Sequence, residues 1–183
     1  MKRELLAGLL LLAMAGGLYL RNISIEPPVV DSLSESEPDY VAREMKTRSY
    51  DANGRLNAEI AADTMFHYQQ KQLTEFENPV YLVYPEDGNT VWKVKAKVGE
   101  LRDNRFLTLE HSVIVEAIEP YKPIRTIHTE QLNLDLSTME METDRQLQAF
   151  GEQFQMTGLG LWADLKQNHI ILKQKVSATY ETQ

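Results

Sequence analysis

The chain of 183 residues contains no cysteine, which excludes disulfide bonds, thiol catalysis and thiolate metal sites and leaves the redox compartment open. Basic residues are also in deficit: 19 Lys and Arg stand against 27 Asp and Glu, for a net charge of −8 and a pI of about 5.1. Nucleic acid is therefore not an expected partner, because phosphate binding needs a basic surface. After the N-terminal residues no window of useful length has a helical period, which favours an all-β fold.

Motifs for catalysis or cofactor binding are also lacking. The histidines are His67, His111, His128 and His169, and they are scattered along the chain. None of them has a partner residue at the spacing of metal ligands. His111-Ser112 together with Asp103 resembles a fragment of a catalytic triad, but these residues fit turn and strand-end positions better. There is no G-x-S-x-G motif, and Gly158-Leu159-Gly160 lacks the third glycine of a dinucleotide loop. We expect no enzymatic activity, no metal and no cofactor.

The N-terminus is the one long apolar run. Met1-Lys2-Arg3 precedes the apolar residues 5–20, and Arg21 closes the run. About 16 apolar residues are slightly fewer than the roughly 20 that a spanning helix prefers, and the preceding positive charge would keep the N-terminus cytoplasmic. Two interpretations remain open. Ala13-Met14-Ala15 offers a signal-peptide cleavage site, whereas the apolar residues that continue beyond it favour an uncleaved anchor.

The chain therefore divides into three predicted parts. Residues 1–21 form the membrane anchor. Residues 22–39 contain Pro27-Pro28 and a serine-rich acidic stretch without apolar periodicity, so we expect an extended, solvated linker. Residues 40–183 form one β domain, which is long enough to bury a sizeable core.

The stretch from Val91 to Glu116 shows the pattern of the whole domain. From Trp92 to Val98 apolar residues alternate with Lys93, Lys95 and Lys97, which predicts a half-buried strand with the lysines on a solvated face. A cationic rim near an anionic ligand is the alternative for these lysines. Asp103-Asn104 then supplies a turn, and alternation resumes at Phe106.

Similar strand patterns run through the rest of the domain. Asp51-Ala52-Asn53-Gly54 is a strong turn signal, because Asn-Gly accepts the positive φ that hairpin turns require. The other predicted strands cover residues 41–50, 56–62, 64–68, 74–76, 80–84, 124–136, 139–142, 146–150, 153–156, 159–165, 169–172 and 176–180.

A repeat of about 30 residues underlies these strands. Four dipeptides begin similar layouts of strand, polar turn and strand: Ala62-Asp63, Ala96-Lys97, Thr129-Glu130 and Gly158-Leu159. Units of this kind bury their apolar faces only by stacking. We therefore expect a repetitive, two-layered antiparallel sheet of sandwich or jelly-roll type, with open edges at its first and last strands.

The apolar faces of these strands would line the space between the two layers. This lining is either an ordinary filled core or a partly open interior that receives an apolar ligand. Methionines suit an adaptable surface and a plain core equally well. Val113 and Leu161 belong to this lining. The candidate ligand-binding residues are Met45, Phe76, Trp92, Val94, Leu107, Leu109, Leu132, Leu134, Met139, Met141, Phe154, Ile170 and Tyr180.

Several segments together resemble the LptC family, the bitopic inner-membrane members of the lipopolysaccharide export system. Each segment is weakly specific alone, but their order and spacing cover nearly the whole β domain. They are Tyr50-Asp51-Ala52-Asn53-Gly54, Phe76-Glu77-Asn78-Pro79-Val80, Trp92-Lys93-Val94-Lys95-Ala96, Leu109-Glu110-His111-Ser112-Val113, Ala149-Phe150-Gly151, Phe154, Thr157-Gly158-Leu159 and residues 175–181.

The resemblance implies a V-shaped β-jelly-roll, open at both ends, in the periplasm behind one transmembrane helix. It implies that lipopolysaccharide arrives from the ATP-binding-cassette complex of LptB, LptF and LptG and leaves to the bridge protein LptA. The first strands would meet the membrane complex and the last ones LptA, with Gly54, Gly151, Val176 and Tyr180 as candidate interface residues. A membrane-tethered scaffold that joins envelope complexes through its β-edges without binding lipid is the alternative.

Overall fold

The computed structural model describes residues 37–84, 91–118, 123–167 and 169–180. The predicted anchor and most of the predicted linker lie outside these residues. Among the described residues no helix is long and apolar enough to cross a membrane. Residues 38–183 form one compact unit, and only this unit is described below.

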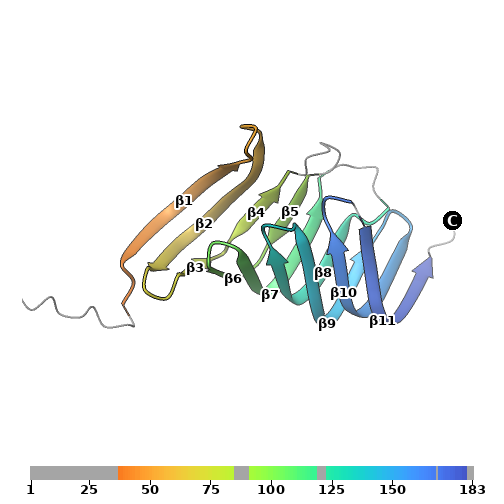
Figure 1. The fold of residues 1–183 in the computed structure, drawn as a ribbon. Helices are drawn as coiled ribbons and strands as arrows, with labels where there is room; N and C mark the ends of the chain where they lie inside the picture. Colours follow the sequence, from red (N-terminus) through yellow and green to blue (C-terminus); the bar gives the residue numbers. More distant parts are fainter. Residues whose placement is uncertain (1–36, 85–90, 119–122, 168, 181–183) are drawn as a thin grey trace, which may run out of the picture. The chain divides into compact units, whose positions relative to one another are not determined.

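The described part of the chain folds into a single antiparallel sheet of eleven strands (Figure 1), which confirms the predicted all-β class. The strands are β1 (Tyr40–Tyr50), β2 (Leu56–Tyr68), β3 (Leu73–Glu77), β4 (Val80–Val83), β5 (Trp92–Lys95), β6 (Val98–Arg102), β7 (Phe106–Ala117), β8 (Thr126–Asp135), β9 (Glu140–Phe150), β10 (Phe154–Asp164) and β11 (His169–Tyr180).

The sheet is a meander in which the short strands combine into longer ones. The first half of β2 pairs with β4 and its second half with β3, so β3 and β4 act as one strand interrupted at Asn78-Pro79. In the same way β7 pairs with β6 and then with β5, which are separated by Ala96-Lys97. Every long strand therefore lies beside its neighbours in sequence, and β1 and β11 are the edges of the sheet.

Each long strand bends near its middle, and the bends lie side by side across the sheet. Residues other than glycine adopt positive φ at several of them, including Glu44 in β1, His111 and Ser112 in β7, and Lys175 in β11. Register shifts mark the same position in β7, β8, β9, β10 and β11. Bulges of this kind turn a strand sharply and let it pass from one layer to the other. We call this row of bends the bend line.

The bend line divides the sheet into two half-sheets that face each other. Half-sheet A contains β4, β5 and the adjoining halves of the long strands; half-sheet B contains β3, β6 and the other halves. The apolar side chains of the inner faces pack into one cluster. Phe76 of half-sheet B meets Tyr81 of half-sheet A edge to face, with ring centroids 6.4 Å apart.

Two details of the predicted strands are wrong. Val91–Val98 is not one strand: the break at Ala96-Lys97 reverses which residues face inward, so Val98 is 39% exposed although Trp92 and Val94 are buried. Conversely, some strands predicted as separate are joined into one continuous strand with a bend. Examples are 56–62 with 64–68 in β2, 139–142 with 146–150 in β9, and 169–172 with 176–180 in β11.

The repeat has a clear structural meaning. All four of its starting dipeptides lie on the bend line: Ala62-Asp63 in β2, Ala96-Lys97 between β5 and β6, Thr129-Glu130 in β8 and Gly158-Leu159 in β10. One repeat of about 30 residues therefore corresponds to two long strands of the meander. Buried threonines make hydrogen bonds to the backbone at the bends. Thr129 Oγ1 donates a hydrogen bond to the carbonyl of Gln146 at 3.0 Å, and Thr143 Oγ1 accepts one from the amide of Arg145 at 3.1 Å.

Candidate functional site

The apolar interior between the half-sheets is the candidate functional site. Strand alternation places it there, because residues directly opposite each other in an antiparallel pair share a face. Leu109 lies opposite Leu132, and Leu134 lies opposite Leu107 on one side and Met141 on the other. These inward rows continue from strand to strand, so the interior is lined by apolar side chains across the sheet.

The middle of the interior is filled. Eight of the predicted ligand-binding residues lie here, each at most 4% exposed: Phe76, Trp92, Val94, Leu107, Leu109, Leu132, Leu134 and Met141. Side chains buried to this degree are in contact with one another. A ligand would reach them only if the half-sheets moved apart.

The remaining predicted ligand-binding residues are accessible. Met45 on β1, Met139 before β9, Phe154 on β10 and Ile170 on β11 are partly buried against the cluster or beside it, and Tyr180 at the end of β11 is 71% exposed. The rings of Phe154 and Tyr180 contact each other at an angle of 50°, with centroids 6.1 Å apart. The interior is therefore packed in the middle and accessible toward both edge strands.

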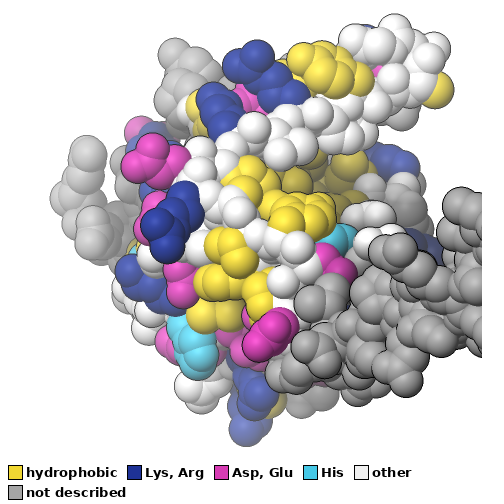
Figure 2. Space-filling model, turned by 90° about the vertical axis from the view of Figure 1, so that its left-hand side faces the viewer, with side chains coloured by type: hydrophobic (Ala, Val, Ile, Leu, Met, Phe, Trp, Pro, Cys, Tyr) yellow, Lys and Arg dark blue, Asp and Glu magenta, His cyan; other side chains and the backbone are white. Residues whose placement is uncertain are grey.

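Figure 2 shows the molecule from the side of β1 and β2. Hydrophobic side chains gather in a hollow at the centre of this face, and Lys, Arg, Asp and Glu side chains border it mainly on the left and below. Partly buried Met45, Ile60 and Met65 belong to this end of the apolar cluster. An apolar opening with a charged rim suits a ligand that has both hydrocarbon and polar parts.

The edges of the sheet carry the predicted partner-interface residues. Gly54 lies in the turn before β2, where it alone of its turn has positive φ (+79°), and the Asp51 carboxylate accepts hydrogen bonds from the amides of Asn53 and Arg55. Val176 and Tyr180 are exposed on β11. Gly151 lies instead in the β9–β10 turn, where an added Cβ would overlap the Phe154 ring and the Pro123 carbonyl oxygen. This glycine is required by local packing.

Outward-facing charged residues pair across neighbouring strands. Lys95 lies 3.1 Å from the Glu116 carboxylate and Lys93 lies 4.0 Å from it, so these two lysines belong to a paired, half-exposed face. Lys46 and Arg48 of β1 both reach Glu59 of β2, and the hydrogen bond from Lys46 is the main cause that lowers the Glu59 pKa. These pairs tie the first edge strand to the sheet.

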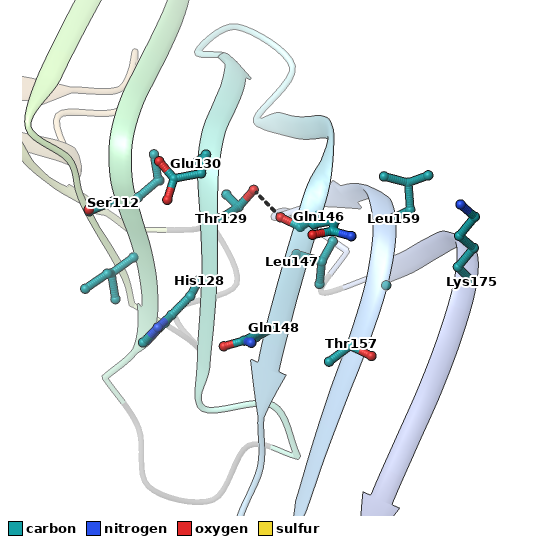
Figure 3. Close-up of a pocket in the computed structure, with 13 residues that line it drawn as sticks. Ser112, His128, Thr129, Glu130, Gln146, Leu147, Gln148, Thr157, Leu159 and Lys175 are labelled. Carbon is teal, nitrogen blue, oxygen red and sulfur yellow. Dashed lines mark hydrogen bonds between the residues drawn. The ribbon is translucent and has the colours of Figure 1, made fainter.

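A second concavity, of about 660 Å³, follows the bend line from β7 to β11 (Figure 3). Its lining mixes polar side chains such as Ser112, His128 and Gln148 with apolar ones such as Val113 and Leu147. The one hydrogen bond drawn among them joins Thr129 to the backbone of Gln146. The residues that line this concavity form no catalytic arrangement, and the His128 ring contacts that of Phe150, at 5.2 Å between centroids.

The histidines do not converge elsewhere either. His67 shares a hydrogen bond with Thr74, His111 forms part of the bend of β7, and the ring of His169 lies against Trp162. Within the described ranges no group of three or more His, Asp or Glu side chains could hold a metal ion.

The sequence did not predict two polar atoms that are buried in the interior without hydrogen-bond partners. Tyr81 is fully buried on β4, and neither its hydroxyl nor the indole Nε1 of nearby Trp92 has a hydrogen-bond partner. The alternation of β4 places Tyr81 inward, but nothing in the sequence shows that its hydroxyl lacks a partner.

These features define a class of protein: an antiparallel β-fold with a bent sheet, an apolar inner face accessible toward both ends, and no catalytic constellation among the described residues. The family described as "Lipopolysaccharide-assembly, LptC-related" matches residues 7–181, which is nearly the whole chain. The chain therefore belongs to the LptC family.

Individual relatives agree with this assignment. The chain is 26% identical over 151 residues to "Lipopolysaccharide export system protein LptC" of Escherichia coli (strain K12), covering 82% of this chain and 79% of that protein. A protein of the same name from Haemophilus influenzae is 27% identical over 161 residues, covering 79% and 77%.

A solved structure is similar in fold. It is the crystal structure of LptH, described as the LptA homologous periplasmic component of the lipopolysaccharide transport device from Pseudomonas aeruginosa. The TM-score is 0.53 at 8% sequence identity, covering 68% of this chain and 95% of that one. At this identity the similarity concerns the fold alone.

Proposed function

We propose that this chain is a membrane-anchored β-jelly-roll that carries lipopolysaccharide between the inner-membrane extraction complex and a periplasmic bridge protein. Membership of a lipopolysaccharide-assembly family supports a role in this transport. The observation that carries the proposal is the apolar interior, which runs from β1 to β11 and is accessible toward both edge strands.

The physical need for such an interior is large. Each methylene moved from an apolar environment into water costs about 0.8 kcal/mol, so one acyl chain of about a dozen carbons costs on the order of 10 kcal/mol. A lipid with several chains crosses an aqueous compartment only if protein replaces the membrane along the way. A continuous apolar lining provides this replacement without chemistry or nucleotide hydrolysis.

The packed middle of the interior determines how the lipid would enter. Between the inner faces the half-sheets meet through apolar side chains such as Phe76 and Tyr81, whereas backbone pairing joins the strands within each half-sheet. The half-sheets separate during transport by opening at the bend line. Acyl chains then replace the apolar contacts that the opening removes.

The partners follow from the two ends of the sheet. Edge strands offer unpaired backbone groups to a strand of another protein. The β1 edge receives the inner-membrane complex of LptB, LptF and LptG, and the β11 edge delivers to LptA. The predicted N-terminal helix holds the domain at the inner membrane, with residues 40–183 in the periplasm.

One specific observation favours the lipid-free scaffold as a second candidate: the middle of the interior has the packing of an ordinary core. The two candidates differ in whether lipid contacts the inner face. Neighbouring isoleucines on β11 provide a matched test, because Ile170 lies opposite Ala163 on the inner face and Ile171 lies opposite Trp162 on the outer face.

A photoreactive amino acid at Ile170 should capture lipopolysaccharide in growing cells, and the same residue at Ile171 should not. Both replacements lie on the same strand, so expression and folding provide an internal comparison. Equal labelling at the two positions, or labelling only at Ile171, contradicts transport through the interior and favours the scaffold.

A further inference from the structure

Two polar atoms are buried without partners in the apolar interior. The Tyr81 hydroxyl and the Trp92 indole Nε1 make no hydrogen bond, and their side chains are 0% and 3% exposed. An unpaired buried polar group loses its hydration without compensation, so native structures contain few of them. Two of them within one interior require an explanation.

The two atoms belong to one place in the fold. Tyr81 lies opposite Val94, and Trp92 lies opposite Val83, so both aromatic side chains are on the inner face of half-sheet A on adjacent strands. The Phe76 ring of half-sheet B covers Tyr81 from the other side. Opening of the half-sheets would therefore uncover the two polar groups together.

The chemistry of both groups selects a hydrogen-bond acceptor. An indole N–H only donates. Burial raises the pKa of the Tyr81 phenol, so the hydroxyl keeps its proton and also donates. Hydrocarbon cannot accept these bonds, whereas the carbonyl and hydroxyl oxygens where acyl chains join a lipid's headgroup can.

We propose that the Tyr81 hydroxyl and the Trp92 indole form a polar subsite within the apolar interior, which donates hydrogen bonds to the ester, amide or hydroxyl oxygens of an acylated glycolipid. This inference rests on the proposed function. Hydrocarbon chains occupy the surrounding apolar surface, and the subsite fixes how deep the lipid's polar linkages lie. In the closed state both donors are left unpaired, which favours lipid entry over closure.

The first test is Tyr81→Phe, which removes one oxygen and keeps the ring. Tyr68→Phe is the matched control, because the Tyr68 hydroxyl donates to Glu75 at 3.3 Å on the outer side of half-sheet B. The full chain is purified in mild detergent, and its affinity for lipopolysaccharide is measured together with its thermal unfolding.

We expect Tyr81→Phe to bind lipopolysaccharide about 2- to 12-fold more weakly, the range that one neutral hydrogen bond supplies. Its unfolding temperature should be unchanged or higher, because an unpaired hydroxyl has been removed. Tyr68→Phe should bind like the unmodified chain. If Tyr81→Phe also binds like the unmodified chain, the subsite does not exist and the proposed transport function still stands.

The second test reads the indole directly. The chain has two tryptophans, so Trp162→Phe leaves Trp92 as the single one. Lipopolysaccharide and its acylated lipid A part should shift the fluorescence emission of Trp92 to longer wavelength, because a hydrogen bond forms at Nε1. Dodecane should not shift the emission, because it cannot accept this hydrogen bond. An equal shift with dodecane overturns the subsite. Failure of the unmodified chain to bind lipopolysaccharide at all overturns both the subsite and the transport function.

Discussion

Phe76→Ala tests whether the interior is packed when no lipid is bound. The Phe76 side chain is 3% exposed, reaches across the interior from β3, and meets Tyr81 edge to face. It also lies beside Gly99, where an added Cβ would be 3.6 Å from the ring. Truncation therefore removes contacts with both half-sheets at once.

The expected loss follows from this burial. A buried aromatic side chain removes about 200 Å² from water, which at about 25 cal/mol per Å² gives an upper limit of about 5 kcal/mol. Measured Phe→Ala substitutions in cores cost about 3–5 kcal/mol, including the cavity that remains. We expect a loss of about 4 kcal/mol in the free energy of unfolding, a large part of a typical total.

The assay is urea unfolding of residues 38–183, followed by circular dichroism of the β-sheet. With a slope of about 2 kcal/mol per M, the midpoint should fall by about 2 M. Phe106→Ala is the matched control: this phenylalanine is 48% exposed on the outer face of β7, with the Arg105 guanidinium 4.6 Å from its ring centroid. Its loss should remain below about 1 kcal/mol.

A loss of less than about 1 kcal/mol for Phe76→Ala would refute the packed interior. The side chain would then border an open groove, and lipid entry would need no separation of the half-sheets. The reasoning about opening at the bend line would fail with it.

Two further substitutions test the periphery of the sheet. Gly151→Ala should cost about 1–3 kcal/mol, because its Cβ would displace the Phe154 ring and the Pro123 carbonyl; an unchanged melting temperature would show that the β9–β10 turn adjusts freely. Asp135 accepts hydrogen bonds from Arg105 at 2.6 and 3.0 Å, which hold its pKa well below the ordinary range. A carboxyl group with a lowered pKa stabilises the folded state at neutral pH, and this contribution is lost as the pH falls below about 4. The stability of Asp135→Asn should therefore depend less on pH on the acid side than that of the unmodified chain. Thermal unfolding at several pH values measures this, and equal profiles for the two proteins would contradict it.

The sequence allowed the inner face and the repeat to be predicted, for physical reasons. Side-chain alternation has a period of two in any strand, so rows such as Leu132 and Leu134 were identified correctly as inward-facing. The repeat was visible because the bends recur every two strands.

The bends themselves were less predictable. Positive φ at Glu44, Ser112 and Lys175 occurs in residue types that rarely adopt it, so no local signal marks these positions. The layers that each strand must join impose the conformation. Each bend also shifts the alternation, which explains why Val98 was placed on the wrong face while Val94 was placed correctly. Whether a buried hydroxyl such as that of Tyr81 finds a partner depends on neighbours far apart in sequence.

The meander has a consequence for how the domain is made. When β3 with β4 and β5 with β6 each count as one interrupted strand, every long strand pairs only with the long strands next to it in the chain. The β3–β6 and β4–β5 pairs lie within one long hairpin. No strand waits for a partner synthesised much later, so the contacts are local and the entropy of closing large loops is avoided. A polypeptide with this order is suited to assemble strand by strand from its N-terminal end, each new hairpin adding to a template already formed.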